Sequence, residues 1–337
     1  MKMVVRRGLG PLAIAILGVC GGYFLGGYDA YVLGIWFIYA LAGLGLTFAV
    51  GWVGEISVGH AGIMAVGAYA AAELANGNVV GGLLIGIASG LVIGFIVGLP
   101  TIRVRGFGLA IVTLAFVELV GAVISNVPQL GGASGIFLTI PALFGTPADL
   151  PMLVVISGVI LAAGIVIAGV LRDSTLGKSW RAVRDNEPLA RALGINPALM
   201  RVTAFAISGA YCGVAGALLS WMLQYLSPDS FDLLLSINLL AIVVIGGKDE
   251  LYGSLLGAGL LTVGGEVLRV TAAVQGVAFG LALLIVVWLL PQGLVPALVG
   301  PIRRRLRASE RMGTRGAASS NAMATELPSS APTAADK

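Results

Sequence analysis

The chain is almost continuously apolar, in segments long enough to cross a membrane, and one extended polar stretch interrupts them. Hydrophobic residues make up 58% of its 337 residues and charged residues 11%, whereas soluble domains carry about 25% charged residues. A transmembrane helix needs roughly 20 apolar residues. The sequence therefore predicts an all-α polytopic membrane protein with about 8–10 transmembrane helices and no room for a separate soluble domain.

Apolar runs and the breaks between them place the expected spans. They cover residues 11–27, 30–51, 56–75, 79–99, 107–126, 152–171, 201–226, 233–247, 251–271 and 274–291. The first and eighth spans are short, and the third is a candidate for a partly re-entrant segment. Residues 1–10 and 301–337 flank a transmembrane domain over 11–300. The C-terminal segment is basic and then rich in Ser, Ala, Thr and Pro, which predicts a disordered tail.

The distribution of Lys and Arg predicts the orientation. With the N-terminus in the cytoplasm and this set of spans, every Lys and Arg except Arg269 lies on the cytoplasmic side, as the positive-inside rule requires. Both termini and the loop 172–200 are therefore expected in the cytoplasm, while the loops 127–151 and 227–232 face outward. The N-terminus also has the regions of a secretory signal, but the many later spans favour an uncleaved first helix.

The polar stretch, residues 172–200, is predicted to form short helices at the membrane surface. Trp180 and Val183 are three residues apart and share one face of a first helix over 179–185. Two interpretations stay open: a rigid unit that takes force from a soluble partner, or helices that rest on lipid. The GKS at 177–179 is no phosphate-binding loop, because Arg172 stands where that motif needs Gly. Any ATP hydrolysis must therefore come from a partner chain.

Proline and glycine delimit a second helix in this stretch. Pro188 disfavours helical geometry at Glu187, so the first helix should end near Asn186 and the second should begin with Pro188. Gly194 is expected to end it in a left-handed conformation, with Ile195 folding back as the hydrophobic partner of the cap. The result is a short amphipathic unit joined to the next span.

Glycine recurs at every fourth residue of the fourth span. The positions are Gly82, Gly86, Gly90, Gly94 and Gly98. A helix face without side chains lets another backbone approach closely, and such ridges are a main source of packing energy in lipid. We expect a helix contact here, with a pathway-lining role as the alternative.

Few polar side chains fall within the spans, and ionisable groups in a membrane are often functional. His60, the only histidine, is expected either to bond to the backbone or to line a pathway. Glu118 is expected to pair with a basic group or to touch the amine of a solute. Asn238, Ser57 and Thr113 complete the candidate pathway residues.

Four motifs carry a family resemblance in their order and spacing. They read ISVGHAGIMAVGAYAAA (56–72), IRVRGFGLAIVTLAFVEL (102–119), SWRAVRDNEPLARALGI (179–195) with the following TAFAISGAYCGVAGALL, and LLAIVVIGGKDELYGSLLGAGLL (239–261). The terminal LLPQGL (289–294) agrees as well. Over roughly residues 43–295 the chain resembles the LivM-type permeases of branched-chain amino-acid ABC importers. It departs from them at Lys248, Asp249 and Glu250, where the family usually has small neutral residues, and in GGASGI (131–136), which lacks the usual preceding Thr.

The resemblance implies a bacterial inner-membrane importer. Its partners would be a second, LivH-like permease, two cytoplasmic ATPases that bind ATP and Mg, and a periplasmic or lipid-anchored solute-binding protein. This chain itself would hold no cofactor, metal or nucleic acid. ATPase coupling would fall on Trp180, Arg181, Arg184, Asp185, Asn186, Glu187, Leu189, Ala190, Arg191, Leu193, Gly194 and Ile195. Exposed Glu187 and Arg191, with the apolar Leu189 and Leu193, are expected to enter a groove on an ATPase.

We therefore expect a transport subunit, not an enzyme, that moves branched-chain or related small amino acids inward by alternating access. Urea and short-amide permeases share the family and remain an alternative. An ion-coupled secondary transporter would need several buried carboxylates near mid-membrane, and a lipid-modifying enzyme would need clustered Asp, His or Arg at one interface. The sparse charges of the spans argue against both.

The predicted orientation is testable with single cysteines. Cysteines introduced at Ser174 and Thr314 should resist a membrane-impermeant thiol reagent in intact cells, because both positions are expected in the cytoplasm. A cysteine at Ala133, in an expected outer loop, should label if its side chain is accessible. Reproducible external labelling at Ser174 would contradict the orientation.

Overall fold

A computed structural model of the chain describes residues 2–267, Gly280 and Val295. The rest of the expected span 274–291, the end of the span before it, Arg269 and the tail 301–337 lie outside the described residues. Within them, regular structure is almost entirely helical, which confirms the predicted all-α membrane fold.

The described part of the chain is a succession of helices. They are α1 (Lys2–Phe24), α2 (Gly27–Leu46), α3 (His60–Leu74), α4 (Val79–Gly98), α5 (Phe107–Asn126), α6 (Leu150–Asp173), α7 (Thr175–Asp185), α8 (Glu187–Ala192), α9 (Pro197–Leu223), α10 (Leu233–Gly246) and α11 (Gly253–Val267). The longest connection in this part is the loop between α5 and α6. A π-helical segment, Thr47–Val53, extends α2. Short 3₁₀ turns are Leu99–Ile102, Pro128–Leu130, Gly132–Ser134 and Pro228–Phe231, and the strands are β1 (Ile136–Phe137), β2 (Ala142–Leu143), β3 (Thr146–Pro147) and β4 (Tyr225–Leu226).

Six segments of the described chain are long and apolar enough to cross a membrane. They are Gly27–Val53, Val79–Ile102, Phe107–Asn126, Leu150–Asp173, Pro197–Leu223 and Pro228–Gly246. With 15 residues, α3 is about 22 Å long, shorter than the roughly 30 Å hydrocarbon core. It therefore cannot cross the core as a straight helix on its own.

Helix boundaries differ from the expected spans in places. α1 begins before its expected position. Residues 54–59 are not helical, because Gly54 ends the π-helical segment with a φ of +85°, and α3 starts at His60 instead of residue 56. α9 ends at Leu223 instead of residue 226, because Gln224 adopts a left-handed φ of +55°.

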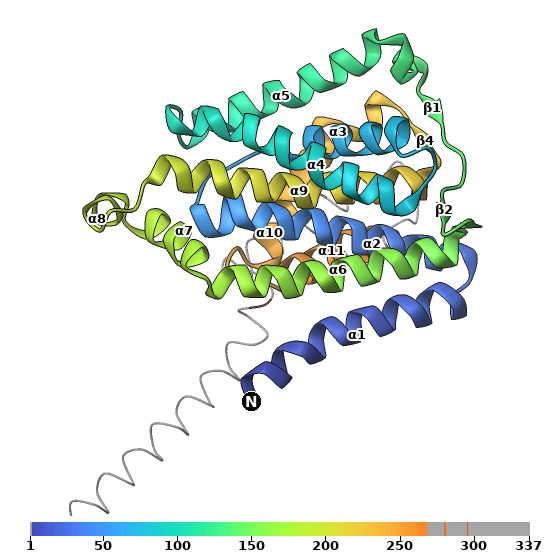
Figure 1. Ribbon diagram of the computed structural model, residues 1–337, viewed down its shortest axis with the longest axis horizontal. Coiled ribbons are helices and arrows are strands. Elements are labelled where there is room, and N and C mark those ends of the chain that lie inside the picture. Colours follow the sequence, from blue (N-terminus) through green and yellow to red (C-terminus); the bar gives the residue numbers. More distant parts are fainter. Residues whose placement is uncertain (1, 268–279, 281–294, 296–337) are drawn as a thin grey trace, which may run out of the picture.

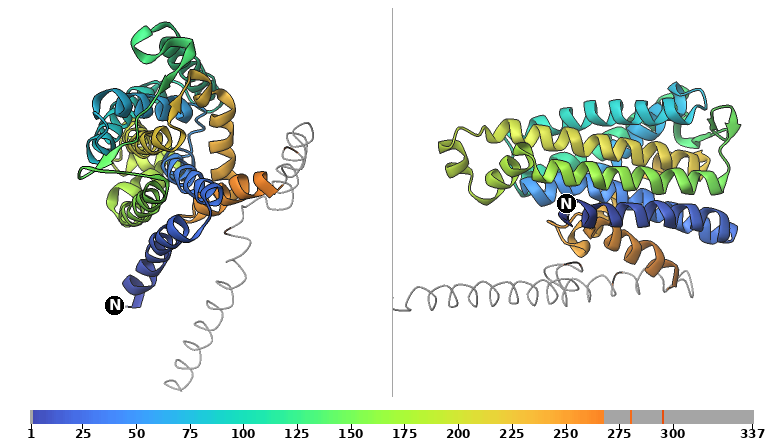
Figure 2. Two further views of the ribbon diagram at one scale, coloured as in Figure 1. Left: turned by 90° about the vertical axis from the view of Figure 1, so that its right-hand side faces the viewer. Right: turned by 60° about the horizontal axis from the view of Figure 1, so that its bottom comes forward.

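The bundle is organised around α2 and α9. In the apolar windows of these two segments 83% and 78% of residues are buried, against 22% in α5, so α2 and α9 form the core and α5 lies at the periphery. Figure 1 shows the helices running roughly along one direction, with α7 and α8 at one end and the strands at the other. α1 packs on α6 at the edge of the bundle (Figure 2).

The glycine face of α4 packs against α9. A Cβ on Gly90 would collide with the backbone of Gly209 and Gly213 in α9, and one on Gly94 would collide with the backbone of Phe205. The other glycines of this face also lie against α9. A Cβ on Gly82 would contact Trp221, one on Gly86 would contact Gly213 and Ala217, and one on Gly98 would contact Phe205 and Val202. Glycines on both helices thus allow a backbone approach that side chains would prevent.

The packing of α4 on α9 generates a prediction. Gly90→Leu should separate the two backbones and destabilise the fold by about 1–3 kcal/mol or more, as overpacking does. Its thermal unfolding midpoint in detergent and its yield of folded protein should fall. Ile87→Leu is the matched control, because Ile87 is 42% exposed on another face of α4. Equal midpoints for Gly90→Leu and the wild-type chain would contradict the close contact.

Candidate functional site

Local capping defines the two short helices at one end of the bundle. The Ser174 hydroxyl accepts a hydrogen bond from the Gly177 N–H at 3.2 Å, so α7 starts at Thr175, earlier than expected. The Asn186 side chain accepts from the Leu189 N–H at 3.0 Å. Because Asn186 is the cap, the first residue of α8 is Glu187 and not Pro188 as predicted.

The C-terminal end of α8 has the predicted left-handed glycine. Gly194 has a φ of +81°, and the Ile195 N–H donates to the Ala190 carbonyl at 3.0 Å, as in a Schellman cap. The Asn196 side chain then caps α9 by accepting from the N–H groups of Ala198 and Leu199. The chain therefore passes from α8 into the long α9 without a flexible linker.

Trp180 anchors α7 to the transmembrane helices. Its side chain is fully buried, with ring centroids 6.1 Å from Phe48 and 6.0 Å from Trp52. Its indole N–H donates to the Thr203 hydroxyl of α9 at 3.2 Å. Val183 on the same face is also buried. The apolar face of α7 therefore contacts this chain itself, and Trp180 offers no surface to an ATPase.

Two arginines of α7 hold the helix in place. The Arg181 guanidinium donates to the carbonyls of Gly177 and Arg172 at 3.2 and 2.8 Å. Arg184 donates to the Gly51 carbonyl at the end of the π-helical segment and pairs with Asp249. It also pairs with exposed Asp185 at 3.0 Å. The charged turn at 248–250 thus supplies a carboxylate to α7.

Glu187 is the centre of an ion-pair cluster, and the expectation that it is exposed is wrong. Its side chain is 15% exposed, and its carboxylate accepts from Arg201 at 2.6 Å and from Arg191, one helical turn later, at 2.8 Å. Arg105, in the loop before α5, donates to both carboxylate oxygens at 2.8 and 2.9 Å. Three cations surround this carboxylate, so it faces the body of the protein.

The electrostatics of this cluster favour the charged form of Glu187. Burial by itself would raise the pKa of this carboxyl, but hydrogen bonds from Arg191 and Arg201 and the charges of Arg201 and Arg105 lower its pKa from 4.5 to about 2. The ionised carboxylate therefore stabilises the fold at neutral pH. That contribution is lost as the pH falls from about 4.3, the value for an unfolded Glu, toward 2.

A second carboxylate extends the cluster into the membrane domain. Glu55, in the non-helical segment after the π-helical turn, lies 2.7 Å from Arg201. Both side chains are buried, at 8% and 6% exposure, and a buried charge needs its partner. Arg201, in the second turn of α9, thus joins Glu187 of α8 to Glu55 of the segment 54–59.

Only part of the predicted coupling surface remains exposed. Leu189 and Leu193 are 56% and 69% exposed, and the Arg191 side chain is 59% exposed. Ala190 is buried against the protein. The large exposed side chains of α8 and its C-terminal cap are therefore two leucines and Arg191, and exposed Asp185 and Asn186 lie beside them.

A buried polar network lies at the start of α3. His60 Nδ1 lies 3.0 Å from the Ser57 hydroxyl, and Nε2 lies 2.7 Å from the Ser208 hydroxyl of α9. The Thr113 hydroxyl of α5 accepts from the Val58 N–H at 3.0 Å. His60 thus bonds to two side chains and not to the backbone as expected.

Two further hydrogen bonds join side-chain hydroxyls to backbone N–H groups around His60. The Ser57 hydroxyl accepts from the Gly59 N–H at 3.3 Å, and the Ser236 hydroxyl of α10 accepts from the Ala61 N–H at 3.2 Å. Non-helical backbone at membrane depth needs such partners inside the protein. The network therefore ties the segment 54–59 and the start of α3 to α5, α9 and α10.

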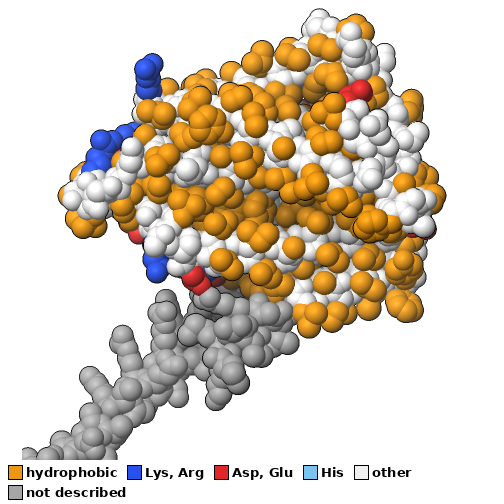
Figure 3. Space-filling model, in the orientation of Figure 1, with side chains coloured by type: hydrophobic (Ala, Val, Ile, Leu, Met, Phe, Trp, Pro, Cys, Tyr) orange, Lys and Arg blue, Asp and Glu red, His pale blue; other side chains and the backbone are white. Residues whose placement is uncertain are grey.

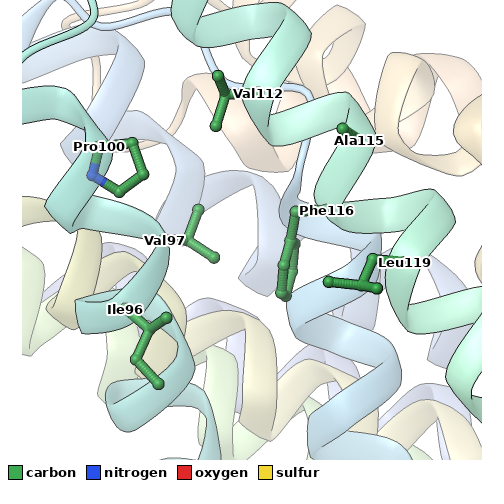
Figure 4. Close-up of a pocket in the computed structure, with 7 residues that line it drawn as sticks. All are labelled: Ile96, Val97, Pro100, Val112, Ala115, Phe116 and Leu119. Atoms are coloured by element: carbon green, nitrogen blue, oxygen red, sulfur yellow. The ribbon is translucent and has the colours of Figure 1, made fainter.

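The structure brings Ser57, His60 and Thr113 together but leaves the other candidate pathway residues apart. Glu118 is exposed on the outer side of α5, and Asn238 is half-buried on α10. A groove of about 280 Å³ between α4 and α5 is lined by Ile96, Val97, Pro100, Val112, Ala115, Phe116 and Leu119 (Figure 4). Its apolar lining offers no partner for the charges of a zwitterion. Within the described residues, no group of three or more His, Cys, Asp or Glu is placed to hold a metal ion.

Sequence reasoning missed Glu55, Arg105 and Arg201 as members of the site. Glu55 and Arg201 each begin an apolar segment, and a charge at the edge of a membrane span is the signal that singles them out. Their pairing could not be read from the sequence, because 146 positions, 201 minus 55, separate them. Ser208 and Ser236 carried no comparable signal.

Comparisons with known proteins agree with this architecture. A family model described as the permease component of branched-chain amino acid transport systems matches residues 30–290. High-affinity branched-chain amino acid transport system permease proteins LivM are 32% identical in Salmonella typhimurium and in Escherichia coli, each covering 87% of this chain and 76% of the relative. The fructose import permease protein FruF of Bifidobacterium longum is 32% identical over 65% of this chain and 64% of its own length. No solved structure matches the chain.

The ion-pair cluster generates a stability prediction. Arg201→Gln removes the shared cation between Glu55 and Glu187 and leaves Glu55 buried without its close partner, so unfolding should become easier by about 3–5 kcal/mol. Arg105→Gln, at a half-exposed partner of Glu187, should cost less than about 1 kcal/mol. Thermal unfolding in detergent compares the two variants. An equal loss in both would contradict the central position of Arg201.

Proposed function

The chain belongs to the family of permease components of branched-chain amino acid transport systems, and we propose that it is one permease of an ATP-driven importer. The observation that carries this proposal is the α7–α8 unit: its inner side is bound to the membrane helices, while Leu189 and Leu193 stay exposed. A helix pair with that arrangement is suited to receive a push from a soluble ATPase and pass it on.

Force on α8 has a direct route into the bundle. Glu187 contacts Arg201, so displacement of α8 acts on the second turn of α9. Arg201 contacts Glu55, and the segment 54–59 moves with it. Through Trp180 and Thr203, α7 acts on the same turn of α9. Rigid contacts of this kind transmit displacement where a flexible loop would absorb it.

The segment 54–59 continues the route toward the centre of the bundle. The Val58 N–H of this segment donates to Thr113 of α5, and the first two residues of α3, which follow it directly, contact α9 and α10: His60 bonds to Ser208 and the Ala61 N–H donates to Ser236. Movement of this segment together with the start of α3 therefore changes hydrogen-bond partners on three helices at once. We assign the switch between outward-open and inward-open states to this rearrangement, and the network around His60 to its pivot.

The proposed assembly contains other chains. A second, LivH-like permease completes the pathway, two cytoplasmic ATPases bind ATP and Mg, and a periplasmic or lipid-anchored protein delivers the solute. This chain binds no cofactor and carries out no covalent chemistry. It resides in the bacterial inner membrane, with the α7–α8 end in the cytoplasm, as the positive charge of that end requires.

The proposed solutes are branched-chain or related small amino acids, which the names of the LivM relatives support. The test is uptake of radiolabelled leucine by the reconstituted importer with its ATPases and binding protein, in competition with isoleucine, valine and urea. ATP-dependent leucine uptake that isoleucine and valine suppress supports the proposal. Uptake that only urea suppresses would reassign the solute, and uptake without ATP would remove the importer mechanism.

Coupling through the tip of α8 is tested by Leu193→Asp. A carboxylate buried in an ATPase groove is unpaired and costs a few kcal/mol, or roughly a hundredfold in affinity. The variant should insert normally but lose its ATPase in pull-down and lose solute uptake together. Leu199→Asp is the matched control, because Leu199 is 54% exposed in the first turn of α9, where an acidic residue is tolerated. If Leu193→Asp binds the ATPase and takes up solute normally, the α7–α8 unit only connects two transmembrane helices and does not couple to an ATPase.

A further inference from the structure

The end of the molecule opposite α8 carries an ordered platform of loops. β1 pairs with β4, so that Ile136 faces Leu226 and Phe137 faces Tyr225. The Tyr225 hydroxyl donates to the Ser134 carbonyl at 2.8 Å. These contacts join the long loop after α5 to the turn after α9, and Figure 1 shows both at the strand-bearing end of the bundle. The platform therefore has a defined shape.

A β-hairpin on this platform is equally well anchored. β2 and β3 pair with each other, and the Ala142 N–H donates to the Gly77 carbonyl in the turn between α3 and α4 at 2.6 Å. The Thr146 hydroxyl donates to the Leu143 carbonyl at 2.7 Å. The hairpin tip is thus held at a set position above the helix ends.

Phe144, at the hairpin tip, has a backbone conformation that is unusual for a bulky residue. Phe144 and Gly145 have φ values of +51° and +86°, the pair of positive values that defines a type I′ turn, in which Asn-Gly is the favoured sequence. A bulky side chain in the left-handed region is an outlier. The Phe144 side chain is nevertheless 90% exposed. It therefore gains no packing within this chain that would offset the unfavourable backbone.

A second exposed aromatic group lies at the same end. Phe137 is 86% exposed, and its ring centroid is 4.8 Å from that of Tyr225. Exposed aromatic side chains on an ordered scaffold are typical of the anchors of protein interfaces. We call Phe137, Phe144 and Tyr225 the aromatic platform.

The charge around the aromatic platform is acidic. Within the described residues, the connections at this end, 25–28, 75–78, 127–149 and 224–232, contain no Lys or Arg. Exposed carboxylates here belong to Asp29, Glu73, Asp149, Asp229 and Asp232. In Figure 3 blue side chains gather near α8, and none is visible at the opposite end. Such a surface repels anionic lipid headgroups and complements a basic protein surface.

We propose that the aromatic platform is a docking surface for a soluble protein that presents an apolar pocket rimmed by Lys and Arg, with Phe144 as the anchor that enters the pocket. This inference rests on the proposed function, which makes that partner the solute-binding protein. Phe144 keeps its strained position because the turn projects its ring away from the permease and into the partner.

The test uses the complete reconstituted importer and its purified, solute-loaded binding protein. Phe144→Asn creates the Asn-Gly sequence that the turn prefers, so the variant should fold at least as well as the wild-type chain and keep its basal ATPase activity. The concentration of binding protein that half-maximally stimulates ATP hydrolysis should rise at least about tenfold. Phe144→Tyr, which keeps the ring, should remain close to wild type. The wild-type half-maximal concentration should rise with added salt.

Phe24→Asn is the control for aromatic contacts with lipid. Phe24, at the end of α1, is 86% exposed at the same end of the molecule but lies on an ordinary helix. Its substitution should leave the half-maximal concentration unchanged. Unchanged stimulation of the Phe144→Asn importer would overturn the docking surface alone, as would an equal loss in Phe24→Asn, which would indicate lipid anchoring. If the binding protein does not stimulate ATP hydrolysis by the wild-type importer, the proposed function is overturned as well.

Discussion

Close packing of two backbones, α4 on α9, positions much of the functional machinery. Glycines on both helices, above all Gly90, Gly209 and Gly213, remove the side chains that would hold the backbones apart. In lipid, helices gain little from hydrophobic burial against each other, so contact area between backbones supplies the packing energy. α9 also carries Arg201, Thr203 and Ser208. A shift of α9 would therefore disturb the ion-pair cluster, the anchor of α7 and the polar network together.

The α7–α8 unit is better understood as part of the membrane domain than as an appendage. Its apolar face is filled by Trp180 packed on Phe48 and Trp52, and Glu187, the first residue of α8, is neutralised by three arginines. What is left for a partner is a small surface formed by Leu189 and Leu193 with the exposed Asp185 and Arg191 beside them. Electrostatic interactions between the charges of the cluster are strong because the cluster is partly desolvated. Exposed apolar side chains, by contrast, suit reversible docking.

The polar centre of the bundle has a structural role that its composition alone does not suggest. The residues from 54 to 59 leave the helical path, and their N–H groups would be unsatisfied in an apolar environment. Thr113 and Ser57 accept from the N–H groups of Val58 and Gly59, Ser236 accepts from the Ala61 N–H at the start of α3, and His60 joins Ser57 to Ser208. Because hydrogen bonds to hydroxyl groups are easily exchanged, such a segment can be rigid in one state and still rearrange in another. Glu118 and Asn238 take no part in this network.

The sequence by itself determined most features set by residues a few positions apart: the apolar helices, the glycine face of α4, the Gly194 cap and the family motifs. Hydropathy, capping and turn chemistry act locally, so a linear pattern is sufficient to predict them. Only the tertiary structure decided that Trp180 and Glu187 face inward, that Arg201 pairs with Glu55 and that α9 is the partner of the glycine face. The direction of an amphipathic face and the partner of a charge depend on which distant segments pack beside them, and that depends on the close approach of whole helices.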